Sequence, residues 1–540
     1  MKKPLKPAEI RAKKRQQELM EIVGEDQYFS DKEAESLQLT ADLDWNQQLL
    51  EKFLDKADDI VKRRVVLPLA DKREALILYV DGLADEVTVS QIIMRTLLIE
   101  LEKVNQDRMQ LQLDIIEQFS EKLVLIGEVT KENMLDKLLT SLLSGDTLLL
   151  IDKCDEAIVM DTRGWQTRGI QEPSAEAVIR GPREGFVETL RINTMLIRRK
   201  LRTSDLKIKT QQLGTKTKTD VAIIYIEGIA NPKIVEEVEK RLKRINIDSV
   251  LESGYLEELI EDCSYSPFPQ IQSTERPDKV VANLLEGRVA IVVDHTPFVM
   301  IVPTLFFQFL QAAEDYYERS LYVSLLRIIR VIALIISLAL PGIYVAAITF
   351  HQEMIPFGFA LSIASGREGT PFPGFLEAMF MGIVFEILRE AGVRLPKPVG
   401  QAVSIVGALV IGESAVNAGV VSPIMVIVAA LTAISSFAIP NFSIILSSTF
   451  IRFFLTLLAA VMGYFGLIWG LLVLLIHLAS LRSFGVPYLS PIAPGNWANL
   501  KDTFVRVPWW GMMKRPHLLA KGNMDRIKPG LRPGPRQGRE

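Results

Sequence analysis

The chain has 540 residues, a formal net charge of −3 and two cysteines, which allows several domains and excludes a disulfide-rich scaffold. Charge is scarce in one long segment: residues 331–480 contain 11 Asp, Glu, Lys and Arg residues, about 7% of the segment, whereas the other 390 residues contain 116, about 30%. A soluble enzyme rarely confines its charge in this way, so the composition predicts a soluble part joined to a membrane part.

Residues 1–64 are polar and strongly charged, and we expect them to form an N-terminal arm that is partly helical. Hydrophobic residues recur at helical intervals between residues 45 and 64, which predicts one helix there. The first 25 residues are basic but lack an apolar core, so we expect no cleaved signal peptide and a soluble part that stays in the cytoplasm. Residues 1–330 carry 46 basic and 56 acidic groups, a balance that disfavours nucleic-acid binding.

An internal repeat follows the arm. Residues 75–85 read ALILYVDGLAD and residues 221–231 read VAIIYIEGIAN, which are 146 positions apart. Residues 142–152 read LLSGDTLLLID and residues 284–294 read LLEGRVAIVVD, which are 142 positions apart. Two matches in register argue for a duplicated unit.

Each copy is predicted to contain a strand, a helix and a β-hairpin. The opening strands, residues 75–80 and 222–226, are runs of branched and aromatic residues, and they place Tyr79 and Tyr225 at equivalent positions. The predicted helices and hairpin strands are residues 89–104, 148–151 and 157–160 in the first copy, and residues 232–245, 290–293 and 299–302 in the second. Asn231 and Pro232 are typical of a helix start.

The predicted soluble part is therefore an α/β cytoplasmic N-terminal domain of two similar tandem lobes. We assign residues 65–202 to the first lobe and residues 203–322 to the second. Residues 203–219, rich in Lys, Thr and Gln, are expected to be an exposed connection. Residues 323–482 are assigned to an α-helical integral membrane domain, and residues 483–540 to a basic cytoplasmic tail.

No catalytic or metal-binding motif stands out in the lobes. The turns at Asp81-Gly82 and Glu227-Gly228 lack a phosphate-binding glycine pattern, and their acidic side chains would repel an anion. The chain has four histidines and neither a zinc-protease motif nor a nucleophile elbow. Cys154 and Cys263 do not have the spacing of zinc ligands. We therefore expect no enzyme activity, no cofactor and no metal site.

The apolar block contains several candidate membrane segments. Residues 331–350 are 20 residues without a charge, enough to cross a hydrocarbon core of about 30 Å. Arg327 and Arg330 precede this run, which places its N-terminal side in the cytoplasm. Pro341 is expected to kink it. The further apolar segments are residues 374–388, 399–420, 423–439 and 453–481.

The number of membrane spans stays open at the level of sequence. Residues 481–540 carry 11 basic and three acidic groups, a charge of +8 that is attracted to an anionic cytoplasmic leaflet. Five spans would place this tail outside, so an even number is expected. We prefer four spans with one re-entrant or pore-facing segment. The alternative is that residues 441–481 fold as two spans around Gly463.

Three carboxylates in the apolar block are the main candidates for a transport role. Glu377, Glu386 and Glu413 each have to pair inside the helix bundle or line an aqueous path, because a carboxylate is costly in a bilayer. Ser414 and Asn417 accompany Glu413, and the four-residue step from Glu413 to Asn417 puts both on one helix face. We therefore expect residues 399–420 to line or support a cation pathway.

Other interpretations of these residues stay open. The alternative for Glu377 and Glu386 is that they lie near the membrane–water interface and simply face water. For Glu413 with Asn417, the alternative is a satisfied hydrogen bond between helices. Arg452 is expected to extend to a membrane edge.

Several stretches carry a family resemblance. They are GPREGFVETL at 181–190, RPD at 276–278 with GRVAIVVD at 287–294, PFP at 371–373, REAGVRLPKP at 389–398 with GQAVSIVG at 400–407, LRSFGVPY at 481–488 and PWW at 508–510. Together they resemble the GerA family of spore germination receptors, specifically its A subunit, over roughly residues 65–520.

The resemblance implies a membrane subunit of a nutrient-responsive receptor in the spore inner membrane, with its N-terminal domain in the cytoplasm. It implies a permease-like B subunit and a lipoprotein C subunit as partners. It also implies self-association, expected to be pentameric, around a cation-conducting channel that triggers germination. The alternatives are a channel-forming paralogue that amplifies germination without sensing nutrient, a secondary transporter and a membrane-anchored scaffold.

Overall fold

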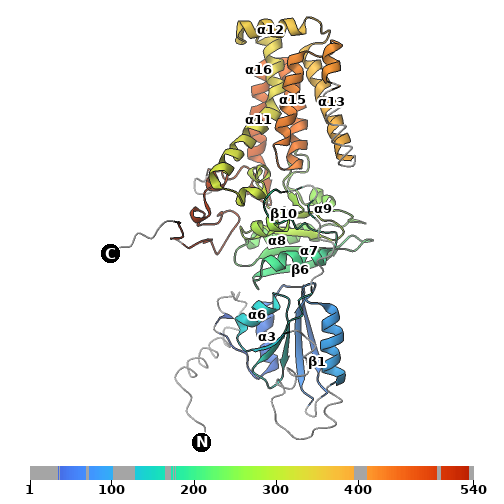
Figure 1. Ribbon diagram of the computed structural model, residues 1–540, viewed down its shortest axis with the longest axis vertical. Helices are drawn as coiled ribbons and strands as arrows, with labels where there is room; N and C mark the ends of the chain where they lie inside the picture. The colour runs from blue at the N-terminus through green and yellow to red at the C-terminus, as the bar shows by residue number, and fades with distance from the viewer. Residues whose placement is uncertain are drawn as a thin grey trace, which may run out of the picture.

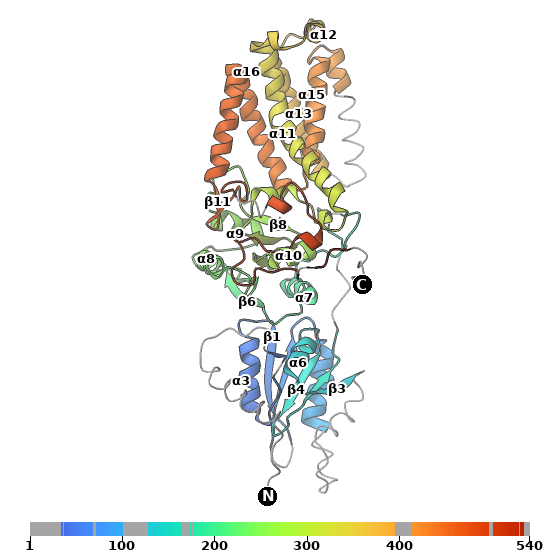
Figure 2. The same cartoon turned by 90° about the vertical axis from the view of Figure 1, so that its left-hand side faces the viewer.

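The computed structural model describes residues 34–35, 37–68, 72–100, 128–164, 172–173, 176, 178–394, 410, 412–495, 500–528 and 530–533. Figures 1 and 2 show three parts stacked along the long axis: a first α/β lobe at one end, a second α/β lobe in the middle and a helical bundle at the other end. The predicted order of two α/β lobes followed by a helical domain is confirmed.

The first lobe is built on a five-stranded antiparallel sheet in the order β1-β2-β4-β5-β3. Its strands are β1 (Ile60–Val66), β2 (Glu74–Val80), β3 (Val129–Glu132), β4 (Thr147–Ile151) and β5 (Ala157–Met160). Alternate strand residues face opposite sides of the sheet. Helices α3 (Leu43–Phe53) and α6 (Leu135–Leu142) cover one side of the sheet. The two short π-helices Thr88–Ile93 and Thr96–Glu100 cover the other side.

The second lobe repeats this sheet in the order β6-β7-β9-β10-β8. Its strands are β6 (Leu206–Leu213), β7 (Thr219–Ile226), β8 (Gln272–Thr274), β9 (Val289–Val293) and β10 (Val299–Val302). Helices α7 (Leu190–Lys200) and α10 (Pro277–Leu284) cover one side, and α8 (Pro232–Lys243) and α9 (Ser253–Ile260) cover the other. The start of α8 is as predicted, because the Asn231 side chain accepts a hydrogen bond from the Lys233 amide.

The duplication is confirmed at the level of strand register. Tyr79 lies opposite Val61 of β1, and Tyr225 lies opposite Lys207 of β6. Tyr225 follows Tyr79 by 146 positions, and Lys207 follows Val61 by the same number, so the two strand pairs have the same register. The two predicted hairpins, β4 with β5 and β9 with β10, are also present.

Two predictions about connecting segments are wrong. The helix expected at 45–64 ends at Phe53, because residues 60–66 pair with β2 as a strand. The connection expected at 203–219 contains β6, which pairs along its whole length with β7. Both segments, β1 and β6, are edge strands, which hydrogen-bond to a neighbouring strand on one side only. Edge strands tolerate polar residues, and these residues led us to assign the two segments to an arm and to an exposed connection. Of the helix expected at 89–104, residues 101–104 lie outside the described residues.

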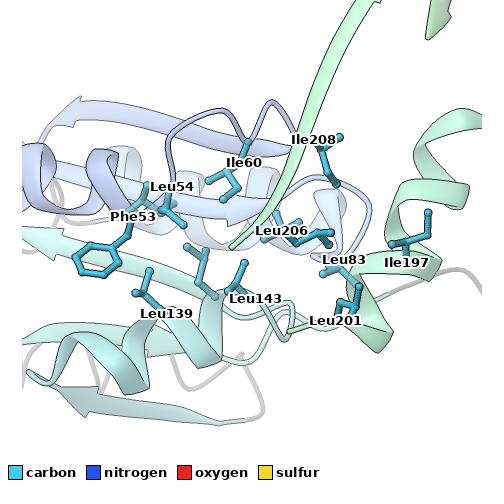
Figure 3. Packing of buried hydrophobic residues seen from close by; sticks show 14 of the residues in the cluster. Phe53, Leu54, Ile60, Leu83, Leu139, Leu143, Ile197, Leu201, Leu206 and Ile208 are labelled. Atoms are coloured by element: carbon cyan, nitrogen blue, oxygen red, sulfur yellow. The ribbon is translucent and has the colours of Figure 1, made fainter. Parts of the chain in front are cut away.

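The two lobes share one apolar core. Figure 3 shows Phe53, Leu54 and Ile60 of the first lobe in the same cluster as Leu206 and Ile208 of the second. A buried ion pair reinforces the junction. Arg198 donates from Nε and Nη2 to the two carboxylate oxygens of Asp59, at 2.9 and 2.8 Å. The lobes are therefore joined by packing and not only by the chain.

The helical bundle comprises α11 (Ser320–Phe350), α12 (Phe357–Arg367), α13 (Gly374–Arg394), α15 (Pro423–Phe437) and α16 (Phe442–Ser480). Among the described residues, α11 and α16 are long and apolar enough to cross a membrane, and α15 is a shorter apolar helix. Helix α11 continues through Pro341. Helix α12 lies across the end of the bundle farthest from the lobes (Figure 1).

Helix α16 is a hairpin of two arms. Gly463 interrupts its 39 residues with φ +62° and ψ −144°, a conformation that only glycine adopts readily. Beyond this turn, Gly470 lies against Leu455 and Leu458 of the first arm, where a side chain would overlap them. The arrangement matches the alternative in which residues 441–481 fold as two spans around Gly463. The total number of spans stays a prediction.

The described part of the C-terminal segment is folded onto the second lobe. It starts with a short hairpin, β11 (Arg482–Ser483) with β12 (Val486–Pro487). Farther along, Ala520 forms a bridge with Ala230, and the Lys521 amide donates to the carbonyl oxygen of Ile229 at 2.9 Å. A segment that looked like a basic tail is therefore part of the folded lobe over residues 482–495 and 500–528.

Candidate functional site

The three acidic candidates lie in different environments. Glu377, in the first turn of α13, has 1% of its surface exposed. Its Oε2 accepts hydrogen bonds from the Ser422 amide at 2.9 Å and the Ser422 hydroxyl at 2.7 Å. Its Oε1 lies 3.2 Å from the Arg367 guanidinium. This carboxylate is therefore paired inside the bundle, where it connects α12 and α13 to the start of α15.

Glu386 is also paired inside the bundle. Its Oε1 accepts from Arg452 Nη2 at 2.8 Å and from the Thr449 hydroxyl at 3.0 Å, and its Oε2 contacts Arg389. The expectation that Arg452 extends to a membrane edge is wrong, because this side chain is 6% exposed and faces α13. A buried arginine needs a carboxylate partner, and Glu386 supplies it.

A small cavity adjoins this ion pair. It has a volume of about 50 Å³ and lies between α11, α13, α15 and both charged groups of the Glu386–Arg452 pair. Thr432, Ser436 and Thr456 contribute hydroxyl groups to its wall. The cavity has room for a few water molecules at most. Within the described part of a single chain, it is a small pocket and not a channel.

Glu413 differs from the other two carboxylates. Residues 412–417 are helical, and Glu413, Ser414 and Asn417 are exposed, whereas Gly412 and Ala415 are buried. Within the described part of the chain, no hydrogen bond or ion pair joins the Glu413 side chain to another residue. The three polar residues thus share the outward face of this turn. Residues 399–409 and 411 of the predicted pathway segment lie outside the described residues.

A buried charge cluster, missed at the level of sequence, joins the bundle to the lobes. Arg327 of α11 is 2% exposed and donates from Nε to Asp315 at 3.1 Å and from Nη1 to Asp502 at 2.9 Å. Arg330 also bonds to Asp315, at 2.8 Å, and the Tyr316 hydroxyl donates to Asp502 at 2.8 Å. Burial raises the pKa of Asp502, and the nearby Arg327 opposes that rise.

The sequence contained part of the signal for this cluster. Arg327 and Arg330 are three residues apart and hence on one helix face, but we read them only as topology signals. Their partner Asp502 is 175 positions from Arg327, and no local pattern links the two. In the described part of the chain, no group of three or more His, Cys, Asp or Glu side chains is placed to hold a metal ion.

Comparison with known proteins decides the family. The family model described as "Bacillus/Clostridium GerA spore germination protein" matches residues 48–518, which include both lobes, the bundle and most of the C-terminal segment. The chain belongs to the GerA family. The resemblance found in the sequence is therefore confirmed.

Individual relatives of this GerA-family chain agree with that assignment. Spore germination protein KA of Bacillus subtilis (strain 168) is 47% identical over 488 residues, covering 90% of this chain and 88% of that protein. The uncharacterized membrane protein YfkQ of the same organism is 48% identical over 447 residues, covering 83% and 86%. The two apolar helices and these relatives identify this GerA-family chain as a membrane protein.

A solved structure also matches part of this GerA-family chain. It is the crystal structure of the N-terminal domain of the A subunit of the Bacillus megaterium spore germinant receptor GerK3. It is 39% identical, covers 50% of this chain and 98% of that one, and has a TM-score of 0.40.

Proposed function

We propose that this chain is the A subunit of a nutrient-responsive spore germination receptor, and that several copies, expected to be five, surround a cation-conducting pore. In this proposal the receptor lies in the spore inner membrane, with the two lobes in the cytoplasm. A permease-like B subunit and a lipoprotein C subunit complete it. Membership of the GerA family supports the receptor role, and the helical bundle supports the membrane location.

One observation carries the channel part of the proposal: the outward face of residues 412–417. Glu413 is exposed and unpaired within the described part of the single chain, in a domain whose other two acidic candidates are paired. An unpaired carboxylate facing lipid is strongly unfavourable, so another subunit or water has to cover it. In a ring of copies, each Glu413 adds one negative charge to a common path, and rings of carboxylates favour cations.

The arrangement of the bundle ends supports the orientation. The start of α11 reaches the second lobe through Arg327, and the end of α16 reaches it through the His477 ring, 2.9 Å from the Ser266 hydroxyl. Both ends of the membrane domain therefore lie on the side of the lobes (Figure 1). This arrangement supports an even number of crossings, with the C-terminal segment on the same side as the lobes.

The variant Glu413→Gln tests the channel proposal. It removes the charge but keeps the shape, so we expect lower monovalent cation flux in liposomes containing the purified receptor, and delayed germination at normal protein level. Glu368→Gln is the matched control, because Glu368 is an exposed carboxylate directly after α12, and the adjacent Gly369 lies against Gly419, close to the turn that carries Glu413. Normal flux combined with lost assembly would show that Glu413 is a structural contact, and this pore assignment would then be abandoned. If cation flux through the wild-type protein does not depend on added nutrient, the alternative of an amplifying paralogue that does not sense nutrient would be favoured over the receptor subunit.

A further inference from the structure

We propose that a cavity between the second lobe, the approach to α11 and the C-terminal segment binds a small organic anion with a flat apolar body, such as an aromatic carboxylate. The cavity has a volume of about 570 Å³. Ligand sites in proteins typically measure about 300–1,000 Å³ and combine apolar walls with a few polar groups. This proposal does not depend on whether the chain forms a channel.

Three segments that are far apart in the sequence form the walls. Helix α10 and the residues after it, up to Arg288, form the first wall. The second contains Tyr316 and Tyr317, in and just after the 3-10 helix Ala313–Tyr316. The third comes from the C-terminal segment and includes Trp509 and Arg515. The cavity therefore exists only while the C-terminal segment is docked on the lobe.

The walls carry an excess of positive charge. Five basic side chains line the cavity against two acidic ones, Asp278 and Glu286, which leaves a balance of +3; the basic residues are Lys200, Lys279, Arg288, Arg515 and Arg526. Both acidic side chains already have arginine partners, Arg276 for Asp278 and Arg526 for Glu286, at 2.8 and 2.7 Å. Lys200 and Lys279 also have carboxylate partners outside the walls, Glu184 at 3.1 Å and Glu176 at 2.7 Å. The positive charge that favours an anionic guest is therefore mainly that of Arg288 and Arg515.

Arg288 is the residue best placed to recognise that anion. It is 3% exposed, its Nη1 donates to the Asn283 side chain, and its Nη2 is 3.7 Å from Glu286. Its Nε has no hydrogen-bond partner among the described residues. This N–H group is covered by protein atoms, so an anion in the cavity would act on the buried Arg288 guanidinium through its charge and not through a hydrogen bond to Nε. Burial lowers the pKa of Arg288, the direction expected for a cation without a full counter-charge.

The rings in the other two walls account for the apolar part of the guest. Tyr316, Tyr317 and Trp509 all line the cavity. Aromatic faces of this kind hold flat apolar groups by stacking and edge contacts. The same Tyr316 donates its hydroxyl to Asp502, the partner of Arg327 at the start of α11. A bound molecule would therefore touch the group that connects the lobe to the first membrane helix.

The duplicated first lobe has an acidic residue at the position of Arg288. Helix α6 of the first lobe matches α10 at an offset of 142, and Asp136 and Lys137 correspond to Asp278 and Lys279. At the position of Arg288, however, the first lobe has Asp146, which forms a bidentate ion pair with Arg163 at 2.8 Å. The charge at this position is therefore negative in the first lobe and positive in the second. The helix before it and the strand after it are present in both lobes, as α6 and β4 in the first and as α10 and β9 in the second.

Equilibrium dialysis of the full chain in phosphatidylcholine nanodiscs tests the proposal. The probe is 2-naphthoate, and its neutral counterpart is 2-naphthamide. We expect one saturable naphthoate site per chain, with naphthoate bound about tenfold more tightly than naphthamide. Ala282→Phe fills the cavity from an exposed position on α10 and should weaken naphthoate binding about tenfold or more. Thr140→Phe, at the equivalent exposed position of α6, should have no effect.

A second variant tests the same proposal if the Ala282→Phe protein does not fold. Lys200→Gln removes one positive charge from the wall, and Glu184 keeps Arg199 as a partner. It should weaken naphthoate binding several-fold and leave naphthamide binding unchanged. The proposal is overturned by any of three results: no saturable naphthoate binding, equal affinity for the two probes, or wild-type affinity in Lys200→Gln or folded Ala282→Phe.

Discussion

Residues of one chemical type have different roles in this chain, and their partners decide which. Glu377 and Glu386 are held by Arg367 and Arg452, whereas Glu413 faces outward with no partner among the described residues. A carboxylate in an apolar helix signals only that a partner or water is needed. Sequence therefore identified the three candidates but did not sort them, because Arg367 and Arg452 lie on other helices than the glutamates that they pair with.

A pair of glutamates in the second lobe predicts a pH dependence of stability. Burial raises the pKa of Glu257 from 4.5 to about 7, and the nearby Glu261 and Glu252 carboxylates add to the rise. The Ser273 hydroxyl, 3.5 Å away, opposes it only weakly. Burial likewise raises the pKa of Glu261 to about 7. Both groups are more easily kept neutral in the folded lobe than in the unfolded chain.

The sign of the effect follows from the raised pKa. The contribution of Glu257 to stability is fully present below pH 4.5 and is lost as pH rises to about 7. Glu257→Gln mimics the neutral form, so it should match the wild type near pH 4.5 and exceed it at pH 8, by on the order of 1–3 kcal/mol. Thermal unfolding of the purified full chain across this range is the measurement. Glu258→Gln, an exposed neighbour, is the control, and equal pH profiles for wild type and Glu257→Gln would refute the assignment.

At the scale of elements, buried strands were predictable and edge strands were not. The strand β7 and its equivalent β2 are apolar runs whose residues are nearly all buried. Their edge neighbours β1 and β6 carry exposed charged and polar residues. Pairing with a neighbouring strand, and not local propensity, makes these two segments extended. In the bundle, too, the sequence alone left the fold of residues 441–481 open, and the α16 hairpin was one of two alternatives.

Gly463 offers a test of that hairpin. Its φ of +62° disfavours any side chain, and a Cβ would lie 2.6 Å from the His351 ring and 3.0 Å from Phe350. We expect Gly463→Ala to destabilise the bundle by roughly 1–3 kcal/mol, measured by thermal unfolding in detergent. Gly485 also has positive φ, but no atom lies within 4 Å of its added Cβ. Gly485→Ala should therefore lose less stability, and an equal loss in the two variants would argue against close packing at the turn.

At the scale of the whole molecule, the C-terminal segment connects lobe and membrane domain. Its composition predicted positive charge near a membrane surface. The described residues instead dock on the second lobe and supply Asp502 to the cluster around Arg327. Such long-range pairing leaves no periodic pattern in the sequence, so it was not predictable. It makes the segment a physical link between the second lobe and α11.

The orientation of the chain gives a further prediction at this scale. Lys521 is exposed, although its amide is bonded to the second lobe. In a variant lacking Cys154 and Cys263, the substitution Lys521→Cys should react with a membrane-impermeant thiol reagent only after the membrane is opened. Each basic group near an anionic leaflet contributes about 1 kcal/mol to this preference. Labelling of intact membranes from outside would contradict both the cytoplasmic placement and the even number of crossings.

The central claim is that the outward face of residues 412–417 lines a water-filled cation path, and cysteine accessibility tests it most directly. The reconstituted receptor, lacking native cysteines in this chain, would carry Ser414→Cys while current is recorded across a planar bilayer. Ser435→Cys is the control, because Ser435 is 6% exposed inside the bundle. The account predicts that a positively charged methanethiosulfonate reagent reduces the current through Ser414→Cys and leaves that through Ser435→Cys unchanged. Complete modification of Ser414→Cys with an unchanged current would contradict it.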